Sequence, residues 1–400
     1  ICSTGILQFK VCRQLITIRD DFQNVNELLD FLNSRPGIEI EAAVNAAEKA
    51  FASWSRTTPA QRSAYLLKIA DRIEAEADGF AALEALNCGK PINAVRNDEI
   101  PAIVDCYRFF AGAVRCMPGQ AAGEYMEGHT SMIRRDPIGL VASIAPWNYP
   151  LMMMAWKLAP AIGGGNTVVF KPSEQTPLTA VALAGILDEV GLPKGILSVL
   201  TGFGDTGKAI VAHPGIDKIT FTGSTAVGKA IMRGCADTLK RVSLELGGKS
   251  PNIVFEDADI KRAVRGVTTG IYYNQGQMCT AGSRVLVHES IHDKFMDAFL
   301  ASVKEIETGS PFDKASRMGS LVSKEQFERV SGYVELGQKE GATLALGGTP
   351  GGSRPLLCAR LPRVSNGRGW MSLSTRLTTG GSEAGVDRSG RWLGGPSSSN

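Results

Sequence analysis

The sequence predicts an α/β protein with a doubly wound parallel sheet, followed by a second α/β domain. Two observations predict this class. The chain has 400 residues, 44% apolar and 21% charged, which is enough for two packed domains with sizeable cores. Between residues 138 and 246, short apolar runs alternate with helical segments of about 10–15 residues, as in successive βαβ units.

Helix limits are predicted from capping residues and helix breakers. Thr58 and Pro59 are typical of an N-cap and a first helical position, and the amphipathic pattern after them runs to about Ala77. A second helix is expected to end near Asn87, because Gly89 follows it. Further helices are expected at residues 151–162, from 176 to 191, and from 291 onward with Ser290 as N-cap.

Strands are expected in six short apolar runs. They lie at residues 138–144, 167–170, 196–200, 218–221, 242–246 and 283–288. Because the first five alternate with helices, we expect them to pair in parallel within one sheet. Ligands of such sheets bind at the carboxyl ends of the strands, so residues that follow the strands are the first candidates for a site.

The two ends of the chain differ from its middle. Residues 351–400 contain 10 Gly, 9 Ser and 7 Arg, but no Lys, Ile, Phe or Tyr. So little large apolar surface predicts a disordered or poorly packed tail. The abrupt loss of Lys indicates a reading-frame change or a linker. Residues 1–36 form an atypical N-terminal segment without a clear strand–turn–helix pattern.

Charge and cysteine content exclude several classes of protein. Lys and Arg total 43 against 40 Asp and Glu, and this net charge of +3 is too small for a typical nucleic-acid partner. The eight cysteines form no CxxC pair, so neither a disulfide framework nor a zinc ribbon is expected, and free thiols favour a cytoplasmic location. No apolar run reaches 18 residues, so we expect no membrane span.

Two glycine-rich turns follow strands. Residues 202–207 fit GxGxxG, but no acidic residue stands at a strand end about 20 residues further on. Residues 202–208 and 223–229 approach a P-loop, but alanine replaces the Ser or Thr that would hold magnesium. We interpret both as strand-to-helix turns whose amides can face a dinucleotide, and residues 221–224 are the better candidate for the pyrophosphate.

Residues 288–292 match the HExxH pattern of zinc sites. Zinc binding through this pattern needs both histidines on one helix face. Here His288 ends a predicted strand and His292 follows the predicted helix start, so the two side chains would diverge. We therefore expect no metal site at this position.

Three residues are candidates for a catalytic site. Cys279 follows a polar, glycine-containing stretch that is typical of an exposed turn, although a lone cysteine is more often a small buried side chain. Glu245 stands between two apolar strand residues, where burial of a carboxylate is costly unless it has a role. Asn148 follows the strand at 138–144, and its amide could donate to a developing oxyanion.

With these residues the chain resembles the NAD(P)-dependent aldehyde dehydrogenase superfamily over about residues 37–350. The matching blocks have the family's order and spacing, including 34 residues from Glu245 to Cys279; they lie at 146–150, 171–174, 221–224, 244–251 and 276–279. Residues 93–112 and 123–136 look most like the aminoaldehyde branch, which includes gamma-aminobutyraldehyde and betaine aldehyde dehydrogenases.

The resemblance implies a mechanism. Cys279 would attack the aldehyde to form a thiohemiacetal, and Asn148 with the backbone N–H of Cys279 would stabilise its oxyanion. Glu245 would activate the water that hydrolyses the later thioester. Lys157 resembles the family's proton-relay lysine, although a lysine there could equally snorkel at the surface.

The resemblance also implies the cofactor NAD and its contacts. A ribose-binding pair, Lys171 and Glu174, would favour NAD over NADP, because the carboxylate repels a 2′-phosphate. Gly204 would border the adenine, and Trp147 and Ser224 would lie near the pyrophosphate. The complete expected set is Pro146, Trp147, Lys171, Ser173, Glu174, Gly204, Gly223, Ser224 and Leu246.

The implied domains are a Rossmann-like NAD-binding domain at 37–246, with an oligomerisation-type β-hairpin near 123–140, and a catalytic domain at 247–350. The catalytic domain is expected to be incomplete. The family has a later strand-rich segment with a Glu-containing Phe-Gly-Pro motif and a C-terminal strand that pairs with a neighbouring subunit. Neither is visible in residues 351–400, so we expect a truncated or frame-shifted C-terminus.

Two functions therefore remain open. The first is oxidation of a small-molecule aldehyde, such as 4-aminobutanal. The family is homo-oligomeric, but this chain lacks the family's C-terminal pairing strand. The second is a catalytically dead NAD-binding fragment. Candidates to hold a cationic substrate tail are Glu99, Asp105 and Tyr149, although these are equally typical of a helix surface and core.

Overall fold

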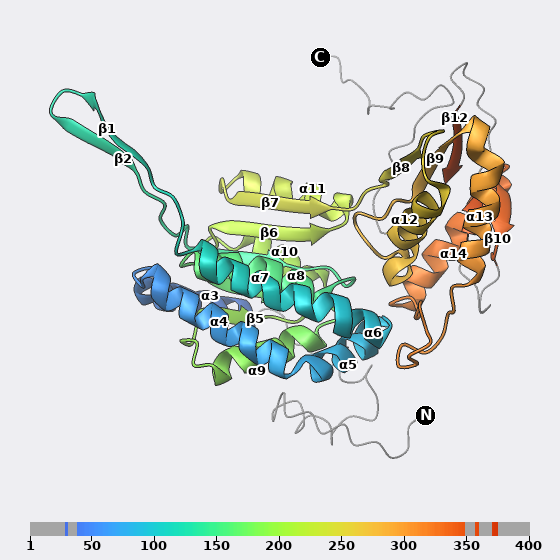
Figure 1. Ribbon diagram of the computed structural model, residues 1–400. Helices are drawn as coiled ribbons and strands as arrows, with labels where there is room; N and C mark the ends of the chain where they lie inside the picture. The colour runs from blue at the N-terminus through green and yellow to red at the C-terminus, as the bar shows by residue number, and fades with distance from the viewer. Residues whose placement is uncertain (1–28, 31–37, 349–356, 360–369, 375–400) are drawn as a thin grey trace, which may run out of the picture.

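The computed structural model describes residues 29–30, 38–348, 357–359 and 370–374 (Figure 1). Figure 1 shows two α/β bodies, one from α3 to β7 and one from β8 to β12. Only residues 29–30 of the atypical N-terminal segment 1–36 are described, so the expectation for this segment lies outside the described residues. The predicted domain limits stay predictions.

The first body contains a five-stranded sheet in which every pair of neighbours is parallel. Its order is β5-β4-β3-β6-β7, so the chain starts in the middle and winds in both directions. The strands are β3 (Leu140–Ile144), β4 (Thr167–Lys171), β5 (Leu197–Val199), β6 (Lys218–Gly223) and β7 (Arg241–Leu246). This order confirms the predicted doubly wound parallel sheet.

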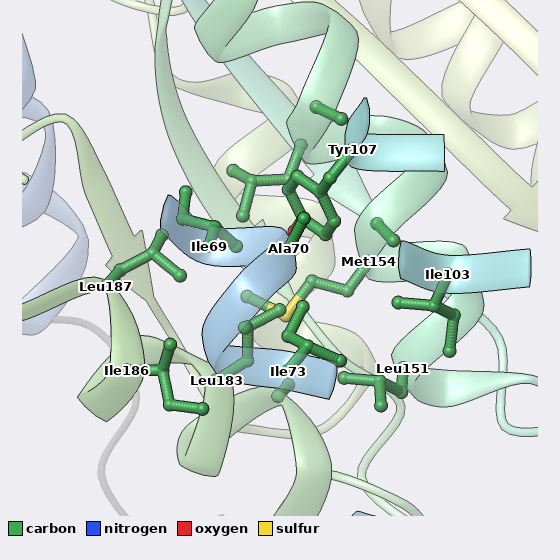
Figure 2. Packing of buried hydrophobic residues seen from close by; sticks show 14 of the residues in the cluster. Ile69, Ala70, Ile73, Ile103, Tyr107, Leu151, Met154, Leu183, Ile186 and Leu187 are labelled. Carbon is green, nitrogen blue, oxygen red and sulfur yellow. The ribbon is translucent and has the colours of Figure 1, made fainter. Parts of the chain in front are cut away.

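Helices cover both faces of this sheet. Successive side chains of β4 point to opposite faces: Val168 and Phe170 pack in one apolar core, and Val169 packs in another. The first core is built with α4 (Pro59–Ala75), α5 (Ala77–Cys88), α7 (Ile100–Ala113), α8 (Pro150–Gly163) and α9 (Leu178–Glu189), and Figure 2 shows part of it. The second is built with α3 (Ile38–Trp54), α10 (Gly204–Ala212) and α11 (Thr225–Ala236).

The predicted helix ends are supported by their caps. The Thr58 hydroxyl accepts from the Gln61 backbone N–H, and the Gln61 side chain accepts from the Thr58 N–H, which makes a capping box. Gly89 ends α5 in the left-handed conformation, with φ of 74°. Between α5 and α7 lie the short α6 (Ile92–Ala94) and a π-helical turn, Val95–Glu99.

The second body has its own sheet and core. In the sheet, β8 (Pro251–Val254) is parallel to β9 (Arg284–His288), and β12 (Trp370–Ser374) is antiparallel to β9. Three helices accompany this sheet: α12 (Ile260–Tyr272), α13 (His292–Lys304) and α14 (Lys324–Lys339). The strands β10 (Thr343–Leu346) and β11 (Leu357–Ala359) form a separate antiparallel pair.

One sequence-based expectation is wrong in this body. Ser290 is not the N-cap of α13, because it lies inside a one-turn 3-10 helix, Glu289–Ile291, and its hydroxyl contacts His288 Nδ1 at 2.8 Å. The expectation of a disordered or poorly packed tail at 351–400 falls mostly outside the described residues, which in this segment are only those of β11 and β12. The tail as a whole is poor in large apolar residues, but the sequence of β12 concentrates Trp, Met and Leu within five positions.

A β-hairpin projects from the first body (Figure 1). It consists of β1 (Gln120–Met126) and β2 (His129–Ile133), and every residue of β2 is exposed. The hairpin overlaps the predicted one near 123–140, but its oligomerisation role stays a prediction. In the described part of the chain, no helix combines the length and apolar character needed to cross a membrane.

Candidate active site

Cys279 lies in an exposed turn that follows α12, as its sequence context predicts. The chain reaches it through a 3-10 turn, Tyr273–Gly276, in which Asn274 and Gln275 have φ of 49° and 56°. Consecutive left-handed residues without a glycine are uncommon and are retained where the surrounding contacts require them. The Gln275 side chain donates to Gly89 O at 2.9 Å and to Ser320 O at 2.8 Å, which fastens the turn at its base.

Asn148 reaches the Cys279 turn from the other body. It follows β3, just before the start of α8. Its side-chain Nδ2 donates to the backbone oxygen of Gln277 at 2.9 Å, two residues before the cysteine. The structure therefore brings the predicted amide donor and the predicted nucleophile to the same place.

Glu245 lies near the carboxyl end of β7, which is the last strand of its sheet. The residue is exposed, so the predicted cost of burying its carboxylate does not arise. Edge position explains the difference, because β7 has an alternating pattern of exposed and half-buried residues instead of the full burial of β3 and β4. Glu245 remains a candidate because it lines the same cleft as Cys279.

Lys157, on α8, has a specific partner. Its Nζ donates to the Thr222 hydroxyl at the end of β6, at 2.7 Å. Burial lowers the pKa of Lys157 to about 8, and the nearby charge of Glu245 opposes this shift. The lysine thus faces the carboxyl edge of the sheet, next to the candidate base, instead of extending into solvent.

Cys279, Asn148 and Glu245 line one cleft of about 210 Å³, which Lys157 does not line although its partner Thr222 does. The cleft lies where β3, β6 and β7 end, the edge at which doubly wound sheets bind ligands. Eight of the predicted residues line it: Pro146, Trp147, Asn148, Gly223, Ser224, Glu245, Leu246 and Cys279. Ser224 is also the N-cap of α11, where its hydroxyl accepts from the Val227 N–H.

The remaining predicted cofactor contacts do not line this cleft. Lys171 is buried at the end of β4, with its Nζ 3.5 Å from a carboxylate oxygen of Glu174, and burial lowers its pKa. Ser173 is buried beside it. Gly204 is the first residue of α10, and no atom lies within 4 Å of the position of a Cβ there.

Sequence reasoning missed one wall of the cleft. This wall comes from the first turns of α14 and contains Ser323, Glu325, Gln326 and Arg329, with Gln175 nearby. Ser323 caps the helix by accepting from the Gln326 N–H at 3.2 Å. The Ser-x-x-Gln spacing is typical of a helix start and could have predicted this one. It could not have predicted that the helix lies opposite β7.

Two of the three residues that were candidates to hold a cationic substrate tail already have partners within the chain. Glu99 is buried, and its carboxylate lies 2.7 Å from Lys90 Nζ. Lys90 also lies 3.3 Å from Glu84 and 4.1 Å from the centre of the Tyr149 ring. Asp105 is exposed on α7. Glu99 and Tyr149 therefore belong to a buried cluster of this chain, as the core interpretation allowed.

The HExxH match at residues 288–292 spans the end of a strand and the start of a helix, as its interpretation expected. His288 ends β9 and His292 begins α13, with a 3-10 turn between them. Among the described residues there is no group of three or more His, Cys, Asp or Glu side chains arranged to hold a metal ion.

A thiol, a carboxylate and an amide donor thus lie at one cleft of a doubly wound α/β sheet, an arrangement that suits nucleophilic catalysis. The sequence matches the model of the aldehyde dehydrogenase family over residues 32–358. The chain belongs to the aldehyde dehydrogenase family, which confirms the resemblance inferred from its motifs.

Individual relatives agree with this assignment. An aldehyde dehydrogenase of Alternaria alternata is 46% identical over 319 residues, covering 79% of this chain and 64% of the relative. A betaine aldehyde dehydrogenase of Mesorhizobium japonicum is 41% identical, covering 80% and 66%. The NAD+ complex of an aldehyde dehydrogenase from Bacillus cereus superposes with a TM-score of 0.78 at 44% identity, covering 81% and 67%. The chain thus spans about two thirds of the length of these proteins.

Proposed function

We propose that this chain oxidises an aldehyde to the carboxylic acid with NAD as cofactor. The observation that carries the proposal is the meeting of Cys279, Asn148 and Glu245 at one cleft. The same cleft contains the N-terminus of α11, whose first-turn amides suit a pyrophosphate. Lys171 and Glu174 form the polar pair expected for a ribose. The residues present therefore fit the cofactor.

In the proposed reaction, the Cys279 thiolate attacks the aldehyde carbon and the former carbonyl oxygen becomes an oxyanion. The Asn148 amide and the Cys279 N–H stabilise that charge. Bound NAD supplies the acceptor for the hydride that leaves this carbon. Glu245 takes a proton from the water that hydrolyses the resulting thioester, and Lys157 can receive that proton in turn.

We also propose an aminoaldehyde as the preferred substrate. The support is the similarity to a betaine aldehyde dehydrogenase and an exposed carboxylate within residues 93–112, the segment that resembles the aminoaldehyde branch. Asp98 is exposed, accepts a hydrogen bond from the Tyr273 hydroxyl at 3.1 Å, and lines a second cleft with that tyrosine. Because Glu99 is paired with Lys90, Asp98 replaces it as the candidate that attracts a cationic tail.

NADH absorbance tests both proposals. We expect oxidation of 4-aminobutanal with NAD, and a higher kcat/KM than for butanal, which has the same chain length without the charge. Asp98→Asn should lower kcat/KM for 4-aminobutanal by ~10-fold and leave butanal unchanged, with Asp105→Asn as the matched control. NAD binding without turnover of any aldehyde would instead identify a cofactor-binding fragment.

A further inference from the structure

Asn274 joins the two halves of the proposed active site. It is buried in the turn before Cys279, and its side-chain Nδ2 donates to Asn148 O at 3.0 Å and to Gln277 O at 3.2 Å. The first of these bonds crosses from the second body to the first. An asparagine amide has only two N–H donors. Asn274 donates one to the segment that carries Asn148 and the other to the turn that carries Cys279.

The same contacts fix the direction of the Asn148 side chain. One of its Nδ2 hydrogens is bonded to Gln277 O, which also accepts from Asn274. The two N–H bonds of an amide are coplanar, so fixing one sets the direction of the other. The second N–H of Asn148 is therefore held at a constant angle to the turn that presents Cys279.

On its own side, the Asn148 segment is held by the buried Lys90 cluster. Lys90 lies over the ring of Tyr149, and a Glu84 oxygen accepts from the Leu151 N–H at 3.4 Å. These contacts tie the start of α8 to α5 and the π-helical turn. The Gln275–Gly89 bond fastens the base of the Cys279 turn to the end of α5, whereas Asn274 and Asn148 provide the direct bonds between the Asn148 segment and that turn.

We propose that Asn274 is a positioning residue, whose side-chain amide sets the geometry between the Asn148 oxyanion donor and Cys279. Asn274 does not line the cleft and acts through Asn148 and Gln277. The expected effect of Asn274 on the reaction rate rests on the proposed function. The expected effect of Asn274 on local structure does not.

The substitution Asn274→Gly isolates the side chain from the backbone. Glycine adopts positive φ without strain, so it keeps the left-handed turn and removes only the amide. Asn274→Asp keeps the size but removes both donors. A matched control is Asp259→Ala, which removes the N-cap of α12, where the Asp259 carboxylate accepts from the Arg262 N–H at 2.9 Å. The control weakens the helix that leads to Asn274 without touching the cleft.

Two measurements are made on these variants. In aldehyde oxidation, both Asn274 variants should lose ~30-fold in kcat with the KM for NAD unchanged, and Asp259→Ala should lose less than ~3-fold. In an Asn148→Ala background, Asn274→Gly should lose no more than ~3-fold further, because its effect passes through Asn148. In hydrogen exchange, amides at 147–149 and 278–280 should exchange at least ~10-fold faster in Asn274→Gly but not in Asp259→Ala.

Full activity of Asn274→Gly, or an undiminished loss in the Asn148→Ala background, would overturn the inference. If the unmodified chain does not turn over aldehyde, the proposed function fails and hydrogen exchange alone decides. Faster local exchange in Asn274→Gly then supports the positioning role, and unchanged exchange at both segments contradicts it.

Discussion

Cys279 is the proposed nucleophile, and its replacement by serine should separate binding from reaction. Cys279→Ser should lower aldehyde oxidation by at least ~10³-fold, because an alkoxide forms far less readily than a thiolate near neutral pH. NAD binding, measured by fluorescence titration, should change by less than ~2-fold. The control is Cys116→Ser, which removes another exposed thiol and should leave the rate unchanged.

Glu245→Gln should allow the first half of the reaction and slow the second. Hydride transfer needs no base at this position, whereas thioester hydrolysis does, so we expect one NADH per active site in a burst followed by a slow steady state. Stopped-flow absorbance measures both phases. Glu325 lines the same cleft from α14, and Glu325→Gln should give no burst. A burst in that variant, with none in Glu245→Gln, would move the base to Glu325.

Lys157 should give the reaction a pH dependence near 8. Burial lowers its pKa from 10.5 to about 8, so it loses its proton as pH rises through 8 and can then accept one from Glu245. Thioester hydrolysis should rise with pH across this range, and Lys157→Met should abolish the rise. Exposed Lys208 offers the control, Lys208→Met.

The same pKa shift predicts a stability change of known sign. Between pH 8 and 10.5 the unfolded chain binds a proton at Lys157 that the folded chain does not. The free energy of unfolding should therefore gain a contribution that rises with pH across this window and is absent in Lys157→Met. Urea unfolding at several pH values measures it. An identical pH slope in both proteins would contradict the burial of this lysine.

The sequence predicted which candidate residues lie together at the cleft better than it predicted their surroundings. Cys279 and Asn148 could be selected from the sequence because each has a clear local context. Cys279 follows a polar turn, and Asn148 follows the end of a strand. Glu245 was selected on the expectation that its carboxylate is buried, and this expectation is wrong. Burial of a strand residue depends on which strand lies at the edge of the sheet, and the sequence does not show that. Glu99 failed similarly, because its partner Lys90 is set by packing between elements.

At the level of elements, the buried Lys90 cluster should be indispensable for the packing of α5 against the start of α8. Lys90→Met leaves Glu84 and Glu99 buried without their cation, and we expect a loss of about 3–5 kcal/mol in the free energy of unfolding. Arg108→Met removes exposed ion pairs to Asp71 and Glu74 and should cost no more than about 1 kcal/mol. Similar losses in the two variants would show that burial of the cluster adds nothing.

Elements of the first body were predictable because each carries its own signal. Thr58 with Gln61 marks a helix start, and the apolar runs of β3 and β4 predict full burial. The strand β12 was missed because composition was averaged over 50 residues, whereas pairing with β9 needs only five. The wall from α14 was missed because the approach of two bodies depends on contacts far apart in sequence.

At the scale of the whole molecule, NAD should stabilise both bodies together. The cleft takes residues from β6 and β7 on one side and from α14 on the other, so a ligand that fills it contacts both. At a concentration of 100 Kd, NAD should add about 2.7 kcal/mol to the free energy of unfolding. Hydrogen exchange should slow in both bodies. Protection confined to the first body would place the cofactor outside the shared cleft.

The order of the five-stranded sheet has a consequence during synthesis on the ribosome. The strand β3 is complete at residue 144, but its second neighbour, β6, begins only at residue 218. At about 5–20 residues per second, the 74 residues from 144 to 218 take ~4–15 s to emerge. For that time one edge of a fully buried, apolar strand has no partner, which is the condition under which nascent chains associate with each other or with chaperones. The hairpin β1–β2, whose strands are two residues apart, closes on a microsecond scale long before.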